Sequence, residues 1–223
     1  MAWIRNIGIL AEAAGSNPRP TDFLAAVHVR AAGYASSEQL AVLLNQIHGA
    51  TRDAKMLVLG RTQADLTQRP GPDSWSVAEC FDHLAQTTRA FLPAISNAIA
   101  SAPNLTTSRP LRTGTLARLF IRNLEPPSRL RFKVIAEIAP RNQDFETAWS
   151  GFLESQSQLA EAMHSAAGLA IDQVRVKAPV YARISYNVYG AFRMLAAHER
   201  RHLWQTEKIF KAIDKIHATR DLA

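Results

Sequence analysis

The chain contains four long segments in which apolar residues recur every three or four positions. This spacing lines one face of an α-helix with apolar side chains, so each segment is predicted to be an amphipathic helix. The first segment runs from about Ser37 to Leu66, and Pro70, Gly71 and Pro72 close it because they break a helix. The pattern therefore predicts a helical protein.

The second predicted helix has a recognisable beginning. Ser76 and Glu79 are spaced as a capping box, in which each side chain bonds the backbone amide of the other residue. The apolar stripe that follows ends near Pro103, and Pro93 lies inside it at a place where a proline can kink a helix.

The two remaining long helices follow a long connection. The third is predicted over about 144–167, with Gly168 as its stop, and the fourth over about 185–216. The connection before them, 101–141, has about forty residues and a short predicted helix near 116–124. A connection of that length can cross the height of a bundle, which lets the second and third helices run parallel.

No pair of alternating strand patterns with a turn between them is evident, so no strands are predicted. The fold class is predicted as all-α, a four-helix bundle with a long crossover connection between helices 2 and 3. Residues 1–35 show no sustained periodicity and are expected to be a flexible or accessory N-terminal extension. Residues 36–223 are expected to form the bundle.

Composition narrows the classes of protein. The 223 residues are 47% hydrophobic and 20% charged, which is typical of a globular protein and excludes a disordered chain. The net charge of +7 is scattered along the sequence, so no nucleic acid is expected as a partner. No apolar run is long enough to span a membrane. A single cysteine, Cys80, cannot form an internal disulfide, and a reducing, cytoplasmic location is expected.

Candidate chemistry is concentrated on the predicted fourth helix, where His198 and His202 are four residues apart. Residues at this spacing are rotated by about 40° and lie one above the other, so both imidazoles can face one metal ion. Such a pair recurs by chance on helices, and a metal site requires a third ligand. The stripe that carries the pair has a polar middle and mostly apolar flanks: Asn187, Ala191, Met194, His198, His202, Gln205 and Ile209.

His83, on the second helix, is the candidate third ligand. It lies between the buried stripe and a polar edge, from which its ring can point into a shallow pocket. The alternative is a histidine at the edge of the core, hydrogen-bonded to a carbonyl. Three imidazoles with an open coordination position suit Zn²⁺, Ni²⁺ or Fe²⁺. The other histidines have no partner at helical spacing and are predicted to be surface or packing residues: His28, His48, His164 and His217.

Two segments together resemble a known family. The segment Asp73–Leu84, DSWSVAECFDHL, is similar to the opening of the second helix in DinB-like proteins, a superfamily of metal-binding four-helix bundles. The segment Ala197–Gln205, AHERRHLWQ, resembles the His-x-x-x-His-x-x-Gln signature of the family's fourth helix. The resemblance extends over roughly residues 37–216 and includes the long connection.

The resemblance implies that His83, His198 and His202 bind a divalent metal, commonly zinc or nickel, with water completing the shell. It also implies a range of activities. Relatives include thiol S-transferases that use low-molecular-weight thiols such as bacillithiol or mycothiol, a mycothiol-dependent isomerase, and metal-dependent hydrolases. The expected partner is therefore a small-molecule substrate, such as a low-molecular-weight thiol. Similar bundles are commonly dimers, and a homodimer is expected here.

Catalytic candidates near the three histidines are Glu79 and Gln205. Glu79 lies one helical turn before His83 and could act as a general base or acid, although its capping box is the simpler role. Gln205 could orient a water, a substrate or a ligand's second ring nitrogen, and Asn187 could do the same.

Three further side chains near the stripe are expected to have structural roles. Glu199 is rotated by about 100° from His198 and is expected to face away from the metal. Cys80 is expected to be a buried thiol rather than a fourth ligand. Trp75 and Trp204 are expected to pack the helix ends and the bundle wall.

Two hypotheses from different classes follow. The first is a metal-dependent enzyme that activates a thiol or water, either a thiol S-transferase or a hydrolase. The second is a non-catalytic metal-binding stress-response bundle, in which the ion joins the second and fourth helices. An open coordination position beside a pocket favours the enzyme. A pocket filled by Met194 and Ile209, or a protein side chain capping the histidines, favours the second hypothesis.

Overall fold

The structure is a computed structural model that describes residues 20–220 except 108, 129–132, 142–143 and 180. Residues 1–19 of the predicted N-terminal extension, and the side chains of residues 20–35, lie outside this description. The backbone of residues 20–35 belongs to the first long helix, which therefore begins earlier than predicted.

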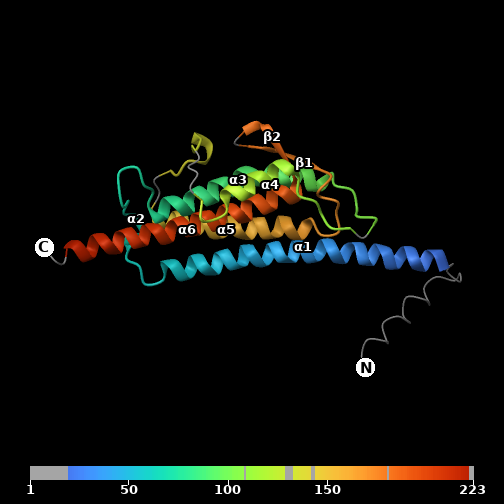
Figure 1. Ribbon diagram of the computed structural model, residues 1–223, viewed down its shortest axis with the longest axis horizontal. Coiled ribbons are helices and arrows are strands. Elements are labelled where there is room, and N and C mark those ends of the chain that lie inside the picture. Colours follow the sequence, from blue (N-terminus) through green and yellow to red (C-terminus); the bar gives the residue numbers. More distant parts are fainter. Residues whose placement is uncertain (1–19, 108, 129–132, 142–143, 180, 221–223) are drawn as a thin grey trace, which may run out of the picture.

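The described chain is mostly helical. Its long helices are α1 (Pro20–Val58), α3 (Val77–Ala100), α5 (Phe145–Ser165) and α6 (Val188–Arg220). Helices α3 and α5 run in the same direction, and α1 and α6 run the opposite way (Figure 1). This arrangement confirms the all-α bundle with a long crossover connection between its second and third long helices.

The crossover connection carries two short elements, α4 (Thr115–Leu124) and the single 3₁₀ turn η1 (Ala136–Ile138). Helix α4 confirms the short helix predicted near 116–124, and it packs against α6. The turn η1 packs against α3. The connection therefore contacts both of the helices that carry the candidate histidines.

The predicted first helix is interrupted near its end. Helix α1 stops at Val58, and a separate helix α2 (Gln63–Thr67) follows. Gly60 lies between them with φ of 74°, a left-handed conformation that glycine adopts without steric cost. Thr62 then restarts the helix, because its side chain and that of Asp65 form a capping box. The prediction of one continuous helix to Leu66 was wrong.

The prediction that the chain has no strands was also wrong. Strand β1 (Arg175–Ala178) pairs with β2 (Tyr181–Asn187) in an antiparallel hairpin, and α6 begins only after it, at Val188. Strand β1 has four residues, which is too short to produce a clear alternation in the sequence. Residues 185–187 consequently belong to the hairpin rather than to the fourth helix.

The predicted capping box is confirmed. The Ser76 Oγ atom accepts a hydrogen bond from the Glu79 amide at 3.2 Å, and the Glu79 carboxylate accepts one from the Ser76 amide at 2.8 Å. Helix α3 continues through Pro93. None of the described helices combines the length and apolarity needed to cross a lipid bilayer.

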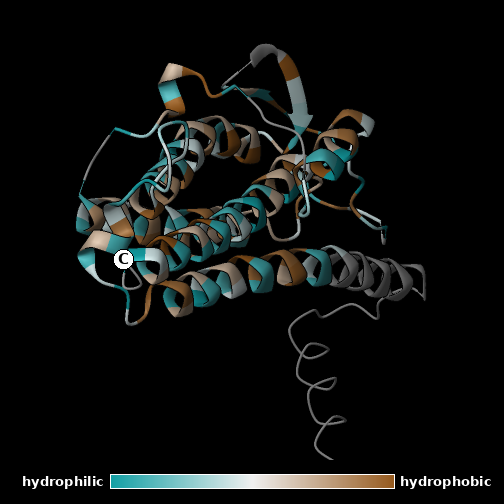
Figure 2. Ribbon diagram, turned by 60° about the vertical axis from the view of Figure 1, so that its left-hand side comes forward, coloured by the Kyte–Doolittle hydropathy of each residue, from teal (hydrophilic) through white to brown (hydrophobic). Residues whose placement is uncertain are grey.

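Two apolar clusters fill the bundle, one at each end. One contains Phe91, Phe192 and Leu159, and the other contains Phe81, Phe152 and Phe210. Hydrophobic and hydrophilic residues alternate along the long helices, as amphipathic packing requires (Figure 2). Buried polar residues of α3 lie where the two clusters meet: Asp82, His83, Gln86, Thr87 and Thr88.

Asn187, at the end of β2, joins three parts of the fold. Its Nδ2 atom donates to the Arg112 carbonyl at 2.7 Å and to the Asp172 carbonyl at 3.1 Å, and its Oδ1 atom accepts from the Gly190 amide at 2.7 Å. A Cβ atom at Gly190 would lie 2.8 Å from Asn187 Oδ1 and 3.0 Å from Ala117 Cβ, so only glycine permits this approach of α4 to α6. Asn187 is therefore a structural cap of α6 and does not extend the histidine stripe.

We expect Asn187→Ala to lower the free energy of unfolding by about 1–3 kcal/mol, because it leaves two part-buried carbonyls and a buried helix amide without this partner. Chemical denaturation measures this change. Asn187→Asp is the informative companion, since it keeps the cap oxygen but removes the donor to both carbonyls. Ser150→Ala, at an exposed position of α5, serves as the control. An Asn187→Ala variant as stable as the control would contradict this role.

Candidate metal centre

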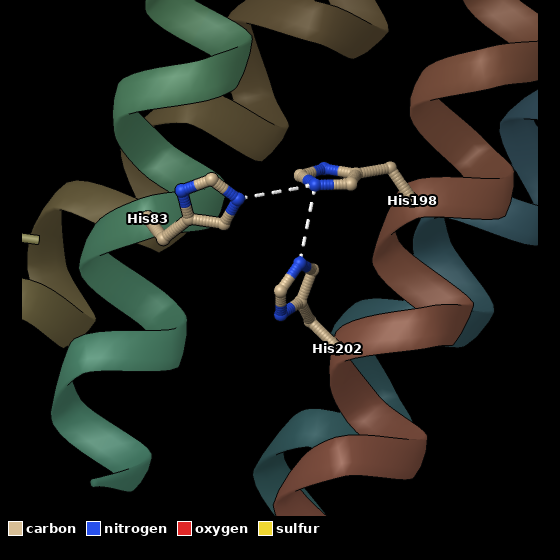
Figure 3. Close-up of side chains that lie close together, drawn as sticks. All are labelled: His83, His198 and His202. Atoms are coloured by element: carbon tan, nitrogen blue, oxygen red, sulfur yellow. Dashed lines mark hydrogen bonds between the residues drawn. The ribbon is translucent and has the colours of Figure 1, made fainter. Parts of the chain in front are cut away.

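Three histidine side chains converge between α3 and α6. The Nε2 atom of His198 lies 3.2 Å from His83 Nε2 and 3.1 Å from His202 Nε2. Figure 3 shows His83 reaching from α3 toward the His198 and His202 rings, which come from adjacent turns of α6. The three residues predicted as metal ligands thus form one cluster, and its ligand atoms all lie within 4.8 Å of one another.

The location of the cluster follows from the apolar pattern of the two helices. On α3, Leu84 packs in one apolar cluster and Phe91 in the other. On α6, Leu203 packs in the same cluster as Leu84, and Ala197 packs in the same cluster as Phe91. The histidines therefore lie at the junction of the two clusters, where apolar packing on both sides holds the helices at a fixed separation.

The connection between α3 and α5 orients His83. The Nδ1 atom of His83 lies 2.6 Å from the Ile138 carbonyl oxygen, which requires a proton on Nδ1 and leaves the Nε2 lone pair directed at the cluster. The Arg141 amide donates to Asp82 Oδ2 at 2.6 Å and fastens the same segment to α3. A ligating histidine ordinarily has such a partner on its second nitrogen. The carbonyl hydrogen bond and the candidate ligand position, posed as alternatives from the sequence, are therefore compatible in His83.

The pKa of each of the three imidazoles is lowered, which favours the neutral form near pH 7. Burial lowers the pKa of His83 despite the opposing effects of the Ile138 carbonyl and Asp82. Burial lowers the pKa of His198 and of His202 well below the ordinary value, and the neighbouring histidines and Arg201 lower both further. Metal ligation requires the neutral form of histidine, so burial prepares these rings to bind an ion.

The cluster fits a divalent ion. A tetrahedral ion with Zn–N bonds of about 2.0–2.1 Å separates its ligand nitrogens by about 3.3 Å, close to the two observed Nε2 separations. Neutral nitrogen donors without a carboxylate or thiolate suit zinc and nickel, and also iron. No fourth histidine, cysteine or carboxylate joins the cluster among the described residues, so the donor set leaves room for an exogenous ligand.

Trp75 packs on the cluster, which the sequence analysis did not predict. Its ring centroid lies 4.9 Å from that of His83 and 5.9 Å from that of His202, and it is stacked on His202 with an angle of 17° between the planes. Trp75 immediately precedes the Ser76 cap, so the start of α3 positions it. Only tertiary structure brings it to His202, because no sequence spacing relates the two residues.

The histidines line a cavity of about 1160 Å³. Its walls come from α3, α4, α6, β2 and the connection, which the sequence does not show to be neighbours. Met194 and Ile209 are part of the wall and do not fill the space. Gln205, Arg201 and Lys208 also line it, and the Lys208 Nζ atom lies 3.7 Å from the centre of the Trp204 ring.

Glu79 has its structural role and is not among the described residues that line the cavity. Its carboxylate accepts from the Ser76 amide and forms an ion pair with Arg69. Burial raises the pKa of Glu79, but the hydrogen bonds from Arg69 and Ser76 outweigh burial and hold the pKa below its ordinary value. A catalytic role for Glu79 stays a prediction. The capping box and the ion pair with Arg69 are sufficient to explain why a glutamate occurs at this position.

Gln205 follows His202 by one turn of α6 and lines the cavity, in agreement with its predicted position on the ligand stripe. Its side chain raises the pKa of His202, although His202 Nδ1 has no partner at hydrogen-bonding distance and angle. The amide is thus the neighbour suited to hold that nitrogen, and its catalytic role stays a prediction. Cys80 is fully buried in the apolar cluster of Phe81 and is not part of the histidine cluster, as predicted.

Glu199 faces α5, away from the cluster, as its helical position predicts. Its Oε1 atom accepts from Gln156 Nε2 at 2.9 Å, while Glu199 Oε2 and Gln156 Oε1 are both buried without a partner. A proton on Oε2 would complete a paired acid–amide contact by donating to Gln156. Burial raises the pKa of Glu199 to about 8, so the protonated form predominates at neutral pH.

The sequence profile of the DinB superfamily matches residues 46–206. This range includes all three histidines, the crossover connection and the start of α3. No curated protein and no solved structure matches the chain significantly.

We expect Glu199→Gln to stabilise the protein most at alkaline pH. The folded carboxyl has a pKa of about 8 against an ordinary 4.5, so wild-type stability falls as pH rises between these values. Glutamine keeps both contacts with Gln156 and does not ionise. Denaturation of the metal-free proteins at pH 8.5 is expected to show a gain of about 2–4 kcal/mol that vanishes near pH 4.5. The exposed Glu154→Gln is the control, and a gain independent of pH would contradict the assignment.

We expect Gln205→Ala to weaken metal binding by about 10–100-fold, because His202 loses the neighbour that holds its ring. Competition with a chromophoric chelator measures the affinity. Gln63→Ala, at an exposed position of α2, is the control. Unchanged affinity in Gln205→Ala would show that Gln205 does not support His202.

Proposed function

Because the chain belongs to the DinB superfamily, we propose that it is a metal-dependent enzyme that activates a thiol or water for attack on a small-molecule substrate. In this proposal His83, His198 and His202 hold a divalent ion. Zinc and nickel are the preferred candidates, and iron is the next. The reaction class is thiol S-transfer or hydrolysis, and a low-molecular-weight thiol is the candidate cosubstrate.

The convergence of three Nε2 atoms on the wall of a large cavity carries the proposal. Neutral imidazoles bring no negative charge, so they leave the charge of the ion available to an exogenous ligand. A bound divalent ion supplies Lewis-acid chemistry, because it lowers the pKa of a water or thiol at its open position.

The surrounding residues support this chemistry in separate ways. The Ile138 carbonyl holds His83 in the tautomer that presents Nε2. Trp75 covers the rings of His83 and His202 and limits the access of bulk water to that side of the cluster. Arg201 lines the cavity, and its charge favours an anionic form of the activated group.

A non-catalytic metal-binding stress-response bundle remains the alternative. That function requires a filled pocket or a capped coordination sphere. Met194 and Ile209 line open space, and among the described residues no further histidine, cysteine or carboxylate joins the cluster. These observations favour the enzyme. A cytoplasmic location and a homodimer belong to the same proposal. The exposed apolar side chains of Val42 and Met56 on α1, and of Leu59 directly after it, offer a surface for the dimer.

We expect the purified protein to bind about one divalent ion per chain and His83→Ala and His202→Ala to lose it, with affinity reduced by more than about 100-fold because each change removes a ligand. Elemental analysis and chelator competition measure this. His164→Ala, at an exposed position of α5, is the matched control. Equal metal content in all four proteins would refute the site.

We expect turnover of an activated electrophile with a thiol, or of an activated ester with water, to depend on the metal and to be lost in His202→Ala. A screen of the two reaction classes with the metal-loaded and chelator-treated proteins measures it. Metal binding without turnover in either class would favour the non-catalytic alternative.

A further inference from the structure

The cavity extends past the histidines in two directions that differ in chemistry. Along α6, Met194 precedes the histidines and Lys208 follows them, and at 1.5 Å per residue these two residues are about 21 Å apart along the axis. The two ends of the cavity therefore offer different surroundings to one ligand, with the metal centre between them.

The end beside the start of α6 is apolar. Phe91 and Met194 form its floor, and Ile184 and Tyr186 of the hairpin and Phe120 and Leu124 of α4 form its walls. The Phe120 and Tyr186 rings lie 6.4 Å apart at an angle of 32°. No charged side chain belongs to this group, so it suits an alkyl chain or an apolar ring.

The charged side chains of the cavity lining are mostly cationic, and one of them, Lys208, follows the histidines on α6. Lys208 and Arg201 of α6 and Lys133 of the connection line the cavity, and Asp73 is the one carboxylate among its described lining residues. Lys208 is held over the Trp204 ring, which keeps its ammonium group at the edge of the cavity. A bound divalent ion would add to this positive charge, and the neutral histidines would not offset it.

One polar group beside the histidines has no partner. The Thr87 hydroxyl is buried and unpaired, and Thr87 lies one turn after His83 on the cavity wall. Buried hydroxyls are ordinarily hydrogen-bonded, so this atom indicates a ligand group near the metal centre. The Thr87 hydroxyl thus offers a polar group beside the histidines, next to the apolar chamber.

We propose that the substrate is an amphipathic anion, with an alkyl chain or apolar ring in the chamber of Phe120, Ile184 and Tyr186 and a carboxylate or phosphate paired with the cationic side chains of the lining, of which Lys208 and Lys133 are the exposed ones. The inference rests on the proposed function, because it places the reacting group at the metal centre between the two ends. The ligand's negative charge would offset the uncompensated positive charge of the site, and its apolar part would fill the chamber.

The test uses the full-length, metal-loaded protein with simple probes and calorimetry. We expect decanoate or decyl phosphate to bind, with decanoate at least about 10-fold tighter than butyrate, because each added methylene gains favourable burial. Decyltrimethylammonium has the same ten-carbon chain as decyl phosphate but the opposite charge, and it is expected not to bind. Comparison of decanoate with decyl phosphate distinguishes the two anionic groups. Equal affinity for decanoate and butyrate, or binding of the cation, would overturn the proposal.

Matched variants test each end. The double variant Lys133→Gln/Lys208→Gln removes two exposed cavity charges and is expected to weaken decanoate binding by about 10-fold. Arg112→Gln/Lys211→Gln removes two exposed charges outside the cavity lining and is expected to have no effect. Ile184→Trp fills the chamber and is expected to reduce the decanoate affinity to that of butyrate. Equal losses in the two double variants would overturn the assignment of the cationic end.

Metal content of each sample separates this inference from the function on which it rests. A protein that holds no metal refutes the proposed function. A protein that holds metal but does not distinguish the probes by chain length and charge refutes the substrate class alone.

Discussion

The structure depends on the approach of three neutral imidazole nitrogens at the junction of two apolar clusters. Separations of 3.1 and 3.2 Å between Nε2 atoms would bring lone pairs together, which is unfavourable unless a cation or a proton lies between them. Burial opposes protonation of His198 and His202. A ring proton can satisfy only one of the two contacts of His198 Nε2, whereas a divalent ion bound by the three nitrogens would satisfy both.

The long crossover connection serves the site as well as the topology. It allows α3 and α5 to run in parallel, and on its path it supplies the Ile138 carbonyl that sets the tautomer of His83. The Arg141 amide fastens the same segment to Asp82, next to that histidine. Helix α4 and the turn η1 thereby convert a histidine pair on one helix and a single histidine on another into an oriented donor set with a wall around it.

The charged residues near the histidine cluster are not evenly placed: the carboxylates are engaged elsewhere, whereas the cations line the cavity. Glu79 is held by its cap and by Arg69, and Glu199 faces Gln156 on α5, so neither carboxylate offsets the charge of the centre. Arg201, Lys208 and Lys133 add positive charge on the cavity side. A site with this balance favours anionic ligands, whereas the hairpin and α4 add an apolar chamber beside it.

The sequence by itself determined the four amphipathic helices, the Ser76–Glu79 cap, the crossover and the three histidines, because each is expressed in local spacing or a short motif. It did not predict the hairpin, since β1 has only four residues, nor the break after Val58, where the left-handed Gly60 interrupts a pattern that otherwise continues. Only tertiary structure decided the contact of Trp75 with His202, the Ile138 partner of His83, the role of Asn187 as a cap and the two ends of the cavity. These features join residues far apart in the chain, and their positions depend on how the helices pack rather than on any periodicity within one segment.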